Sequence, residues 1–153
     1  MHLRLFCALV VAAAVLDTAD AQTNPLLGRW QIEAAAVAPW VAPDKIATMI
    51  KETDVRRFVK QRITFEAAAV KSPDPVFACK GATYEPTRIP PEGLFQGGLP
   101  APQGTIARAL GLPDGPSPGV DVACPNSRFS YHFRDKDTAL FALDNVIYTL
   151  KRR

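Results

Sequence analysis

Two cysteines and one histidine are the strongest candidates for chemistry beyond residue 21, namely Cys79, Cys124 and His132. In an exported chain an even pair of cysteines favours a disulfide, which here would stabilise the fold by about 3–4 kcal/mol. A metal site made of both thiolates and His132 is the alternative, but it is one ligand short of a structural zinc site. The pattern therefore predicts a disulfide between Cys79 and Cys124, and no metal.

Side chains that could carry catalysis are sparse. His132 is placed by strand alternation on a polar, outward face, where it gives little support to a Ser-His-Asp or Cys-His arrangement. There is no phosphate loop and no His-Glu-x-x-His motif. Glu85 with Glu92 and Asp135 with Asp137 are conceivable carboxylate pairs, but they lie in predicted turns or loops, where acids are normally solvated. We therefore expect no enzymatic activity and no cofactor.

The first 21 residues have the pattern of a secretory signal peptide. Arg4 supplies a positive charge, residues 6–16 form an apolar run too short to span a membrane, and residues 19–21 form a small-x-small cleavage site. Cleavage after Ala21 would leave one domain, residues 22–153. We expect this domain to be periplasmic or secreted.

The charge pattern bounds the partners. The formal net charge is +3, and the basic residues are scattered apart from Arg56-Arg57 and residues 151–153. Nucleic-acid binding usually shows a denser basic face with aromatic residues between the charges. We therefore expect no nucleic-acid partner, no stable insertion into a membrane, and a monomer.

The elements that must position these residues are organised around residues 26–36. From Gly28 the side chains alternate, with Trp30, Ile32 and Ala34 on one face, as in a strand with one buried side. The sequence Gly28-Arg29-Trp30 resembles the opening motif of lipocalins and lipocalin-like bacterial proteins. The resemblance implies a β-barrel that is closed around Trp30.

The remaining chain predicts a mainly β fold. We expect one antiparallel β-barrel or strongly curved sheet of about 7–8 strands. Residues 44–60 predict one or two short helices, with Ile46, Met49 and Ile50 on a shared face. A long Pro/Gly-rich loop covers residues 86–119, with helical turns over residues 105–110. Further strands are predicted at residues 61–68, 76–85, 120–124, 128–134, 138–143 and 146–151.

Local patterns add detail to these strands. Ile63 and Phe65 share one face of their strand, and Arg128 is placed on the outward face of its own. Residues 138–143 are mostly apolar, as for a strand covered on both sides. Asp144-Asn145 predicts a two-residue hairpin turn after them.

Five aromatic residues are candidates for ligand contact, namely Trp30, Trp40, Tyr84, Phe95 and Tyr131. Trp40 lies between two prolines and is interpreted as a lid over the barrel mouth or, preferably, as a plug under it. Trp30, Tyr84 and Tyr131 have an alternative interpretation as ordinary core residues.

Two functions follow as hypotheses. The first is an exported binding module whose barrel holds a small, mainly apolar molecule. The second is a protein-interaction module, such as an inhibitor or immunity-type partner of a cell-envelope enzyme, which the long loop and the outward charges favour. An internal cavity distinguishes the two, because small barrels are often filled by their own side chains.

Overall fold

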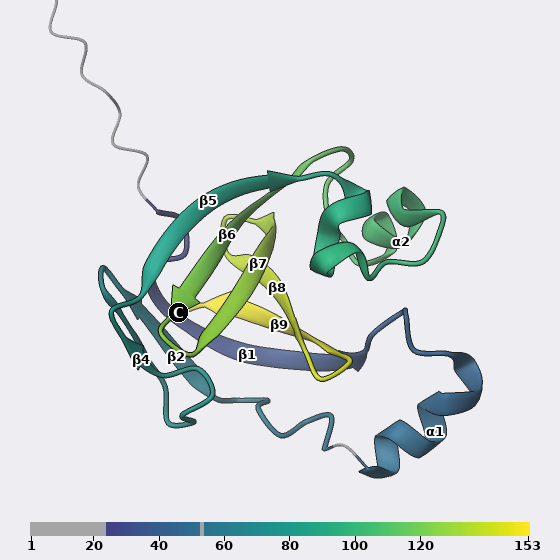
Figure 1. Cartoon of the computed structure of the whole chain (residues 1–153), viewed down its shortest axis with the longest axis horizontal. Coiled ribbons are helices and arrows are strands. Elements are labelled where there is room, and N and C mark those ends of the chain that lie inside the picture. The colour runs from purple at the N-terminus through teal and green to yellow at the C-terminus, as the bar shows by residue number, and fades with distance from the viewer. Residues whose placement is uncertain (1–23, 53) are drawn as a thin grey trace, which may run out of the picture.

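A computed structural model describes residues 24–52 and 54–153 of the chain (Figure 1). The predicted signal peptide, residues 1–21, lies outside the described residues. In the described part, nine strands form one antiparallel sheet in the order β4-β3-β2-β1-β9-β8-β7-β6-β5. The sheet curves strongly into a half-barrel (Figure 1), so the predicted fold class is confirmed, with more strands than the 7–8 expected.

The bounds of the elements follow the chain. The strands are β1 (Gly28–Val37), β2 (Arg62–Glu66), β3 (Ala69–Lys71), β4 (Cys79–Lys80), β5 (Thr83–Ile89), β6 (Ser117–Cys124), β7 (Ser127–Asp135), β8 (Thr138–Leu143) and β9 (Val146–Arg152). The helices are α1 (Pro43–Glu52), the 3-10 helix η1 (Pro91–Gly97) and α2 (Gln103–Ala109).

Strand β1 follows its predicted alternation as far as Ile32 and then departs from it. Trp30 and Ile32 are fully buried, but Ala34 is exposed. Between Ile32 and Ala34 the register against β9 shifts, so one extra residue forms a bulge and moves the following side chains to the opposite face. Ala35 packs against the interior instead. Alternation predicts faces only while the ladder is regular.

The predicted strand over residues 76–85 is wrong. Residues 69–71 form the short strand β3 after a tight turn at Ala67-Ala68, which has none of the usual turn residues. The chain then makes β4, turns at Gly81 with φ of +75°, and begins β5 at the opposite edge of the sheet. A positive φ favours glycine. Gly81 thus separates two strands that the apolar pattern joins into one.

The concave face of the sheet is filled by side chains. Trp30, Phe65, Phe141 and Tyr131 are among its largest buried residues. The ring centroids of Tyr131 lie 5.2 Å from those of Phe65 and 5.3 Å from those of Phe141, so the aromatic side chains pack directly against one another. The interior is an aromatic core.

A second cluster covers part of the convex face, where η1 and α2 pack on the outside of the sheet (Figure 1). β8 is buried on both sides as predicted, with Phe141 inward and Leu140 outward under the helices. The predicted loop over residues 86–119 is shorter than expected, because its two ends belong to β5 and β6. Its predicted helical turns are present as α2, and its apolar residues anchor it to the sheet.

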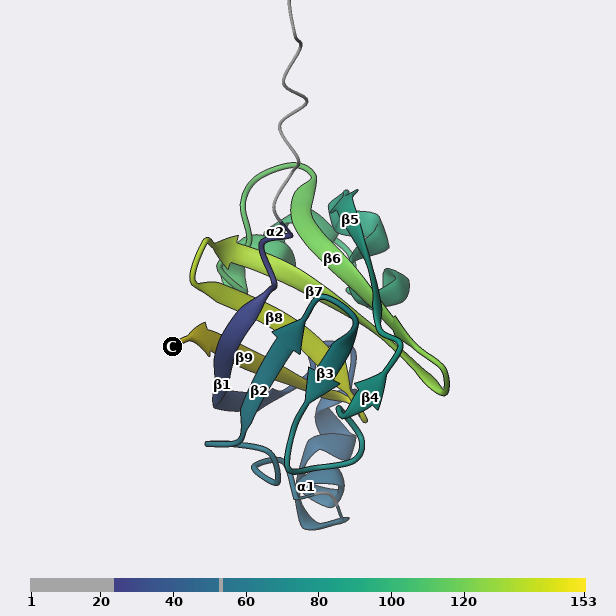
Figure 2. The ribbon, with the colours of Figure 1, turned by 90° about the vertical axis from the view of Figure 1, so that its left-hand side faces the viewer.

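Helix α1 projects from one end of the sheet (Figure 2). Of its predicted apolar face, Met49 packs against the interior, whereas Ile50 is 54% exposed. The shared face is therefore only partly buried, because the helix has few neighbours on its outer side (Figure 2). Within the part of the chain that the structure describes, no helix has the length and apolar character to cross a bilayer.

Candidate functional site

Phe95 is positioned by an irregular turn inside η1. Phe95 and Gln96 have φ of 50° and 61°, which reverse the chain direction within the 3-10 segment. The Phe95 amide donates a hydrogen bond to Nε2 of His132 over 3.3 Å, and the two rings meet edge to face at 4.8 Å. The buried His132 side chain of β7 therefore holds Phe95 in place on the outer face of the sheet.

Trp40 is positioned by the β8–β9 turn. Its indole Nε1 donates to Oδ1 of Asn145 over 2.9 Å. Asp144 and Asn145 both have positive φ, as expected for the predicted two-residue hairpin turn. The Trp40 ring lies 5.7 Å from that of Phe95 and packs on Gly98, where a Cβ would lie 3.2 Å from the indole. The β8–β9 turn and Gly98 together orient the indole.

These contacts form one groove, which we call the aromatic groove, with a volume of about 310 Å³. Trp40 and Phe95 provide its aromatic wall, and Arg128, Asp144 and Asn145 give it a polar rim. Its other lining residues are Gln96, Gly98, Phe129, Ser130, Ala142 and Leu143. A second hollow of about 520 Å³ shares Phe129 and Leu143 with it and extends to the disulfide.

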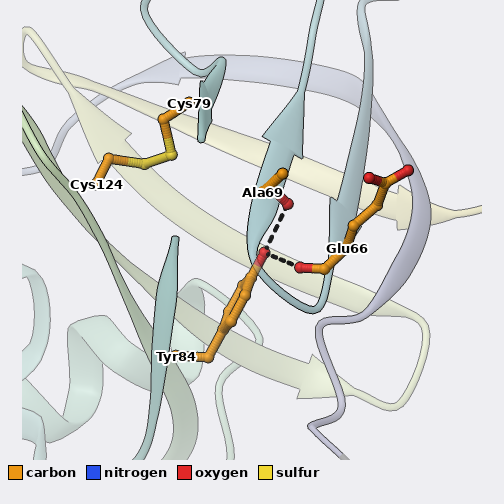
Figure 3. Close-up of a disulfide and its surroundings, with 5 residues drawn as sticks. All are labelled: Glu66, Ala69, Cys79, Tyr84 and Cys124. Atoms are coloured by element: carbon orange, nitrogen blue, oxygen red, sulfur yellow. Dashed lines mark hydrogen bonds between the residues drawn. A yellow bond between two sulfur atoms is a disulfide. The ribbon is translucent and has the colours of Figure 1, made fainter. Parts of the chain in front are cut away.

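The predicted disulfide is present. Cys79 of β4 and Cys124 of β6 are bonded with 2.03 Å between their sulfurs (Figure 3). The bond joins the edge strand β4 to β6, which is the neighbour of the opposite edge strand β5. We call the place where the β4 side of the sheet meets the β5 side the seam. The Tyr84 hydroxyl also bridges this seam, lying 2.8 Å from the Glu66 carbonyl and 3.0 Å from the Ala69 carbonyl (Figure 3). Burial, with the Glu66 charge, raises the pKa of Tyr84 to about 12, so the hydroxyl stays protonated as a donor.

The five aromatic candidates separate into three places. Trp40 and Phe95 meet in the aromatic groove, and Trp40 belongs to the outer cluster, so it does not plug the barrel interior. Tyr84 lies in the seam. Trp30 and Tyr131 are core residues with exposed fractions of 0% and 2%, and Trp30 donates its indole proton to the Leu26 carbonyl.

The predicted exposure of His132 is wrong, although its predicted strand face is right. Its strand face was predicted correctly, because Tyr131 and Phe133 point inward and His132 points outward. It was expected in solvent, but η1 covers that face and the residue is 1% exposed. Burial lowers the pKa of His132 to about 4, against an opposing effect of the Asp121 charge. The sequence signal that could have indicated this burial was Leu94-Phe95, an apolar pair that is buried against the outer face of the sheet.

Ser117, Asp121 and His132 share this covered outer face. Ser117 is fully buried. Three buried side-chain atoms on this face have no hydrogen-bond partner among the described residues, namely Ser117 Oγ, Asp121 Oδ1 and His132 Nδ1. Residues 115–119 also match the string Gly-x-Ser-x-Gly, with which some hydrolases present a serine on a strand-to-helix turn. Here Ser117 begins β6 and has no exposure, so the string presents no accessible nucleophile.

Asn145 and Arg128 are the groove residues that the sequence did not single out. Asn145 was recognised only as a turn residue, and Arg128 only as an outward strand position. Among the described residues, no three His, Cys, Asp or Glu side chains gather as a metal site would require. The groove combines an aromatic wall with hydrogen-bonding groups at its rim.

Comparison with known proteins finds no family model, no curated protein and no solved structure that matches this chain. The resemblance of Gly28-Arg29-Trp30 to lipocalin-like proteins therefore stays a prediction.

Proposed function

We propose that this protein is an exported protein-interaction module, an inhibitor or immunity-type partner of a cell-envelope protein, that binds a segment of its partner in the aromatic groove. The proposal assigns no reaction and no cofactor to it. The observation that carries it is the pairing of a partly exposed Trp40 with Phe95 in a surface groove beside Arg128. Tryptophan, other aromatic residues and arginine are enriched at the centres of protein interfaces.

The packed interior favours a partner on the outside of the sheet. The concave face is occupied by contacting aromatic rings, so a ligand there would have to displace core side chains. The aromatic groove needs no such displacement, because its wall is already held by the hydrogen bonds of Trp40 with Asn145 and of Phe95 with His132. Preorganised side chains lose less conformational entropy on binding.

Export is supported by the disulfide between Cys79 and Cys124, which is typical of proteins in oxidising compartments. A disulfide-closed scaffold with a filled core also suits a rigid inhibitor, since its binding surface changes little on association. The proposed compartment is the periplasm or the exterior of the cell.

The experiment compares binding by Trp40→Ala with binding by Ile50→Ala, a matched loss of an exposed apolar side chain on α1. Immobilised protein is exposed to envelope extract of the source cells, and each retained protein is purified and titrated by calorimetry. We expect the wild type and Ile50→Ala to bind one envelope protein equally. Trp40→Ala should bind it at least about thirtyfold more weakly, as for a hot-spot tryptophan.

Arg128→Glu provides a second test that leaves the aromatic packing in place, because Arg128 is largely exposed. It should also weaken binding, while circular dichroism and the melting temperature report that the fold is kept. Equal binding by the wild type, Trp40→Ala and Arg128→Glu would refute the proposal. Saturable one-to-one binding of the apolar dye ANS that Trp40→Ala abolishes, without any protein partner, would instead favour a small apolar ligand.

A further inference from the structure

A separate hollow of about 280 Å³ lies at the other end of β1 from Trp40. It is lined by six residues, Arg29, Trp30, Gln31, Arg62, Thr64 and Arg153. Three of the six are arginines and none is acidic. The proposed function makes no use of this part of the molecule.

The strand register brings the polar groups of the hollow onto one outer face. Arg29 lies opposite Thr64, and Gln31 lies opposite Arg62, on the adjacent antiparallel strands β1 and β2 (Figure 2). The intervening Trp30 is fully buried on the inner face, so its neighbours on β1 point outward. Arg29 and Arg62 are therefore diagonal neighbours in the sheet, within reach of one another for long side chains.

The two diagonal arginines have no counter-ion in the part of the chain that the structure describes. Among the ion pairs of residues 24–52 and 54–153, none includes Arg29 or Arg62. Arg153 is different, because it contacts Glu33 and donates from Nε to Gln31 Oε1 over 3.0 Å. Like charges on neighbouring strands repel one another. A bound anion would remove this repulsion.

We propose that this hollow binds a phosphate group. Guanidinium groups donate paired hydrogen bonds to oxyanions, and the Thr64 hydroxyl adds a donor between the two arginines. A phosphate monoester offers three acceptor oxygens and a charge of about −1.5 to −2 at pH 7, which matches two unpaired arginines and several donors. A carboxylate offers only two oxygens and one charge. The volume of the hollow leaves space for the group that carries the phosphate.

The test is a titration of the folded protein with inorganic phosphate, followed by amide NMR shifts at constant ionic strength with chloride as the reference anion. We expect saturable shifts at Arg29, Gln31 and Thr64, and none at the aromatic groove. Arg62→Gln should weaken phosphate binding about tenfold or more, as expected for the loss of one charge-assisted contact. Arg56→Gln, which removes the same charge from an exposed site outside the hollow, should leave the affinity unchanged.

A second arm distinguishes free phosphate from a phospholipid headgroup. Wild type, Arg62→Gln and Arg56→Gln are sedimented with vesicles of phosphatidylglycerol and, as control, of phosphatidylcholine. Binding to the anionic vesicles that only Arg62→Gln reduces would identify a lipid headgroup as the source of the phosphate. The proposal is overturned if neither probe binds, or if Arg62→Gln and Arg56→Gln reduce binding equally, which would indicate diffuse attraction by net charge.

Discussion

His132 shows how one buried side chain couples the outer face of the sheet to pH. Its neutral Nε2 accepts the Phe95 amide proton, and a protonated ring would lose this hydrogen bond and leave a buried charge. Its pKa is lowered from 6.5 to about 4 in the folded state. Between these values the unfolded chain binds a proton that the folded chain does not, so folding stability falls as the pH drops from 6.5 toward 4.

We predict that replacement of His132 by glutamine flattens this pH dependence. The wild type should lose about 3 kcal/mol of unfolding free energy through His132 over that interval, since each unit of pKa shift corresponds to about 1.4 kcal/mol. Gln Oε1 can accept the Phe95 amide proton but does not titrate. Urea unfolding of both proteins at neutral pH and near pH 4 measures the difference. Identical pH dependence in the two proteins would show that His132 does not titrate in this range.

At the level of elements, the seam between β4 and β5 determines how the half-barrel is closed. Both strands are edges of the sheet, and they are consecutive in the chain without pairing with each other. The Cys79–Cys124 disulfide and the Tyr84 hydroxyl connect the two sides instead. Pro86 in β5 lacks an amide proton, which also limits pairing of this exposed edge with another chain.

We predict that the double substitution Cys79→Ser and Cys124→Ser lowers the free energy of unfolding by about 4 kcal/mol, because the bridge closes a loop of 45 residues. Hydrogen exchange should accelerate first at the amides of β4 and β5, and last in the central pair β1–β9. Tyr84→Phe, which removes only the hydroxyl bridge, should cost about 1 kcal/mol. Uniform acceleration across the sheet would contradict a role confined to the seam.

At the level of the whole molecule, Arg152 joins the beginning of the described chain to its end. The guanidinium lies 4.4 Å from the Trp30 ring centroid, and its Nη1 donates to the Leu27 carbonyl over 2.9 Å. Nη2 contacts the Pro25 carbonyl. The residues around Trp30 are therefore held in place only once β9 has paired with β1. The contacts of Arg152 with Leu27 and Pro25 span more than 100 residues of sequence, so they close a very long loop.

We predict that Arg152→Met lowers the free energy of unfolding by about 2 kcal/mol, through loss of the cation–π contact and of hydrogen bonds to backbone carbonyls. Methionine keeps an apolar stem of similar length over Trp30. The exposed Arg56→Met is the matched control and should change stability by less than about 0.5 kcal/mol. Guanidinium unfolding followed by tryptophan fluorescence compares the two. Equal stability of both variants would remove Arg152 from this role.

Local patterns predicted the features that depend on near neighbours in the chain. The alternation at Ile63 and Phe65, the Asp144-Asn145 turn and the helical turns of α2 are confirmed. The candidate site was only partly predictable. Trp40 and Phe95 were both singled out, but Asn145, which orients Trp40, was not, because it lies 105 residues away.

The sequence alone determined that this chain forms an antiparallel, strongly curved sheet with an inward tryptophan at its first strand and a cysteine bridge. These properties follow from periodicity and residue type, which act locally. Only the tertiary structure decided which outward faces are covered, where the sheet edges meet, and which side chains share a hollow. His132 is buried because η1 folds over it, and Arg29 meets Arg62 because β2 pairs with β1. Such outcomes depend on contacts between distant segments, and periodicity within one strand has no information about them.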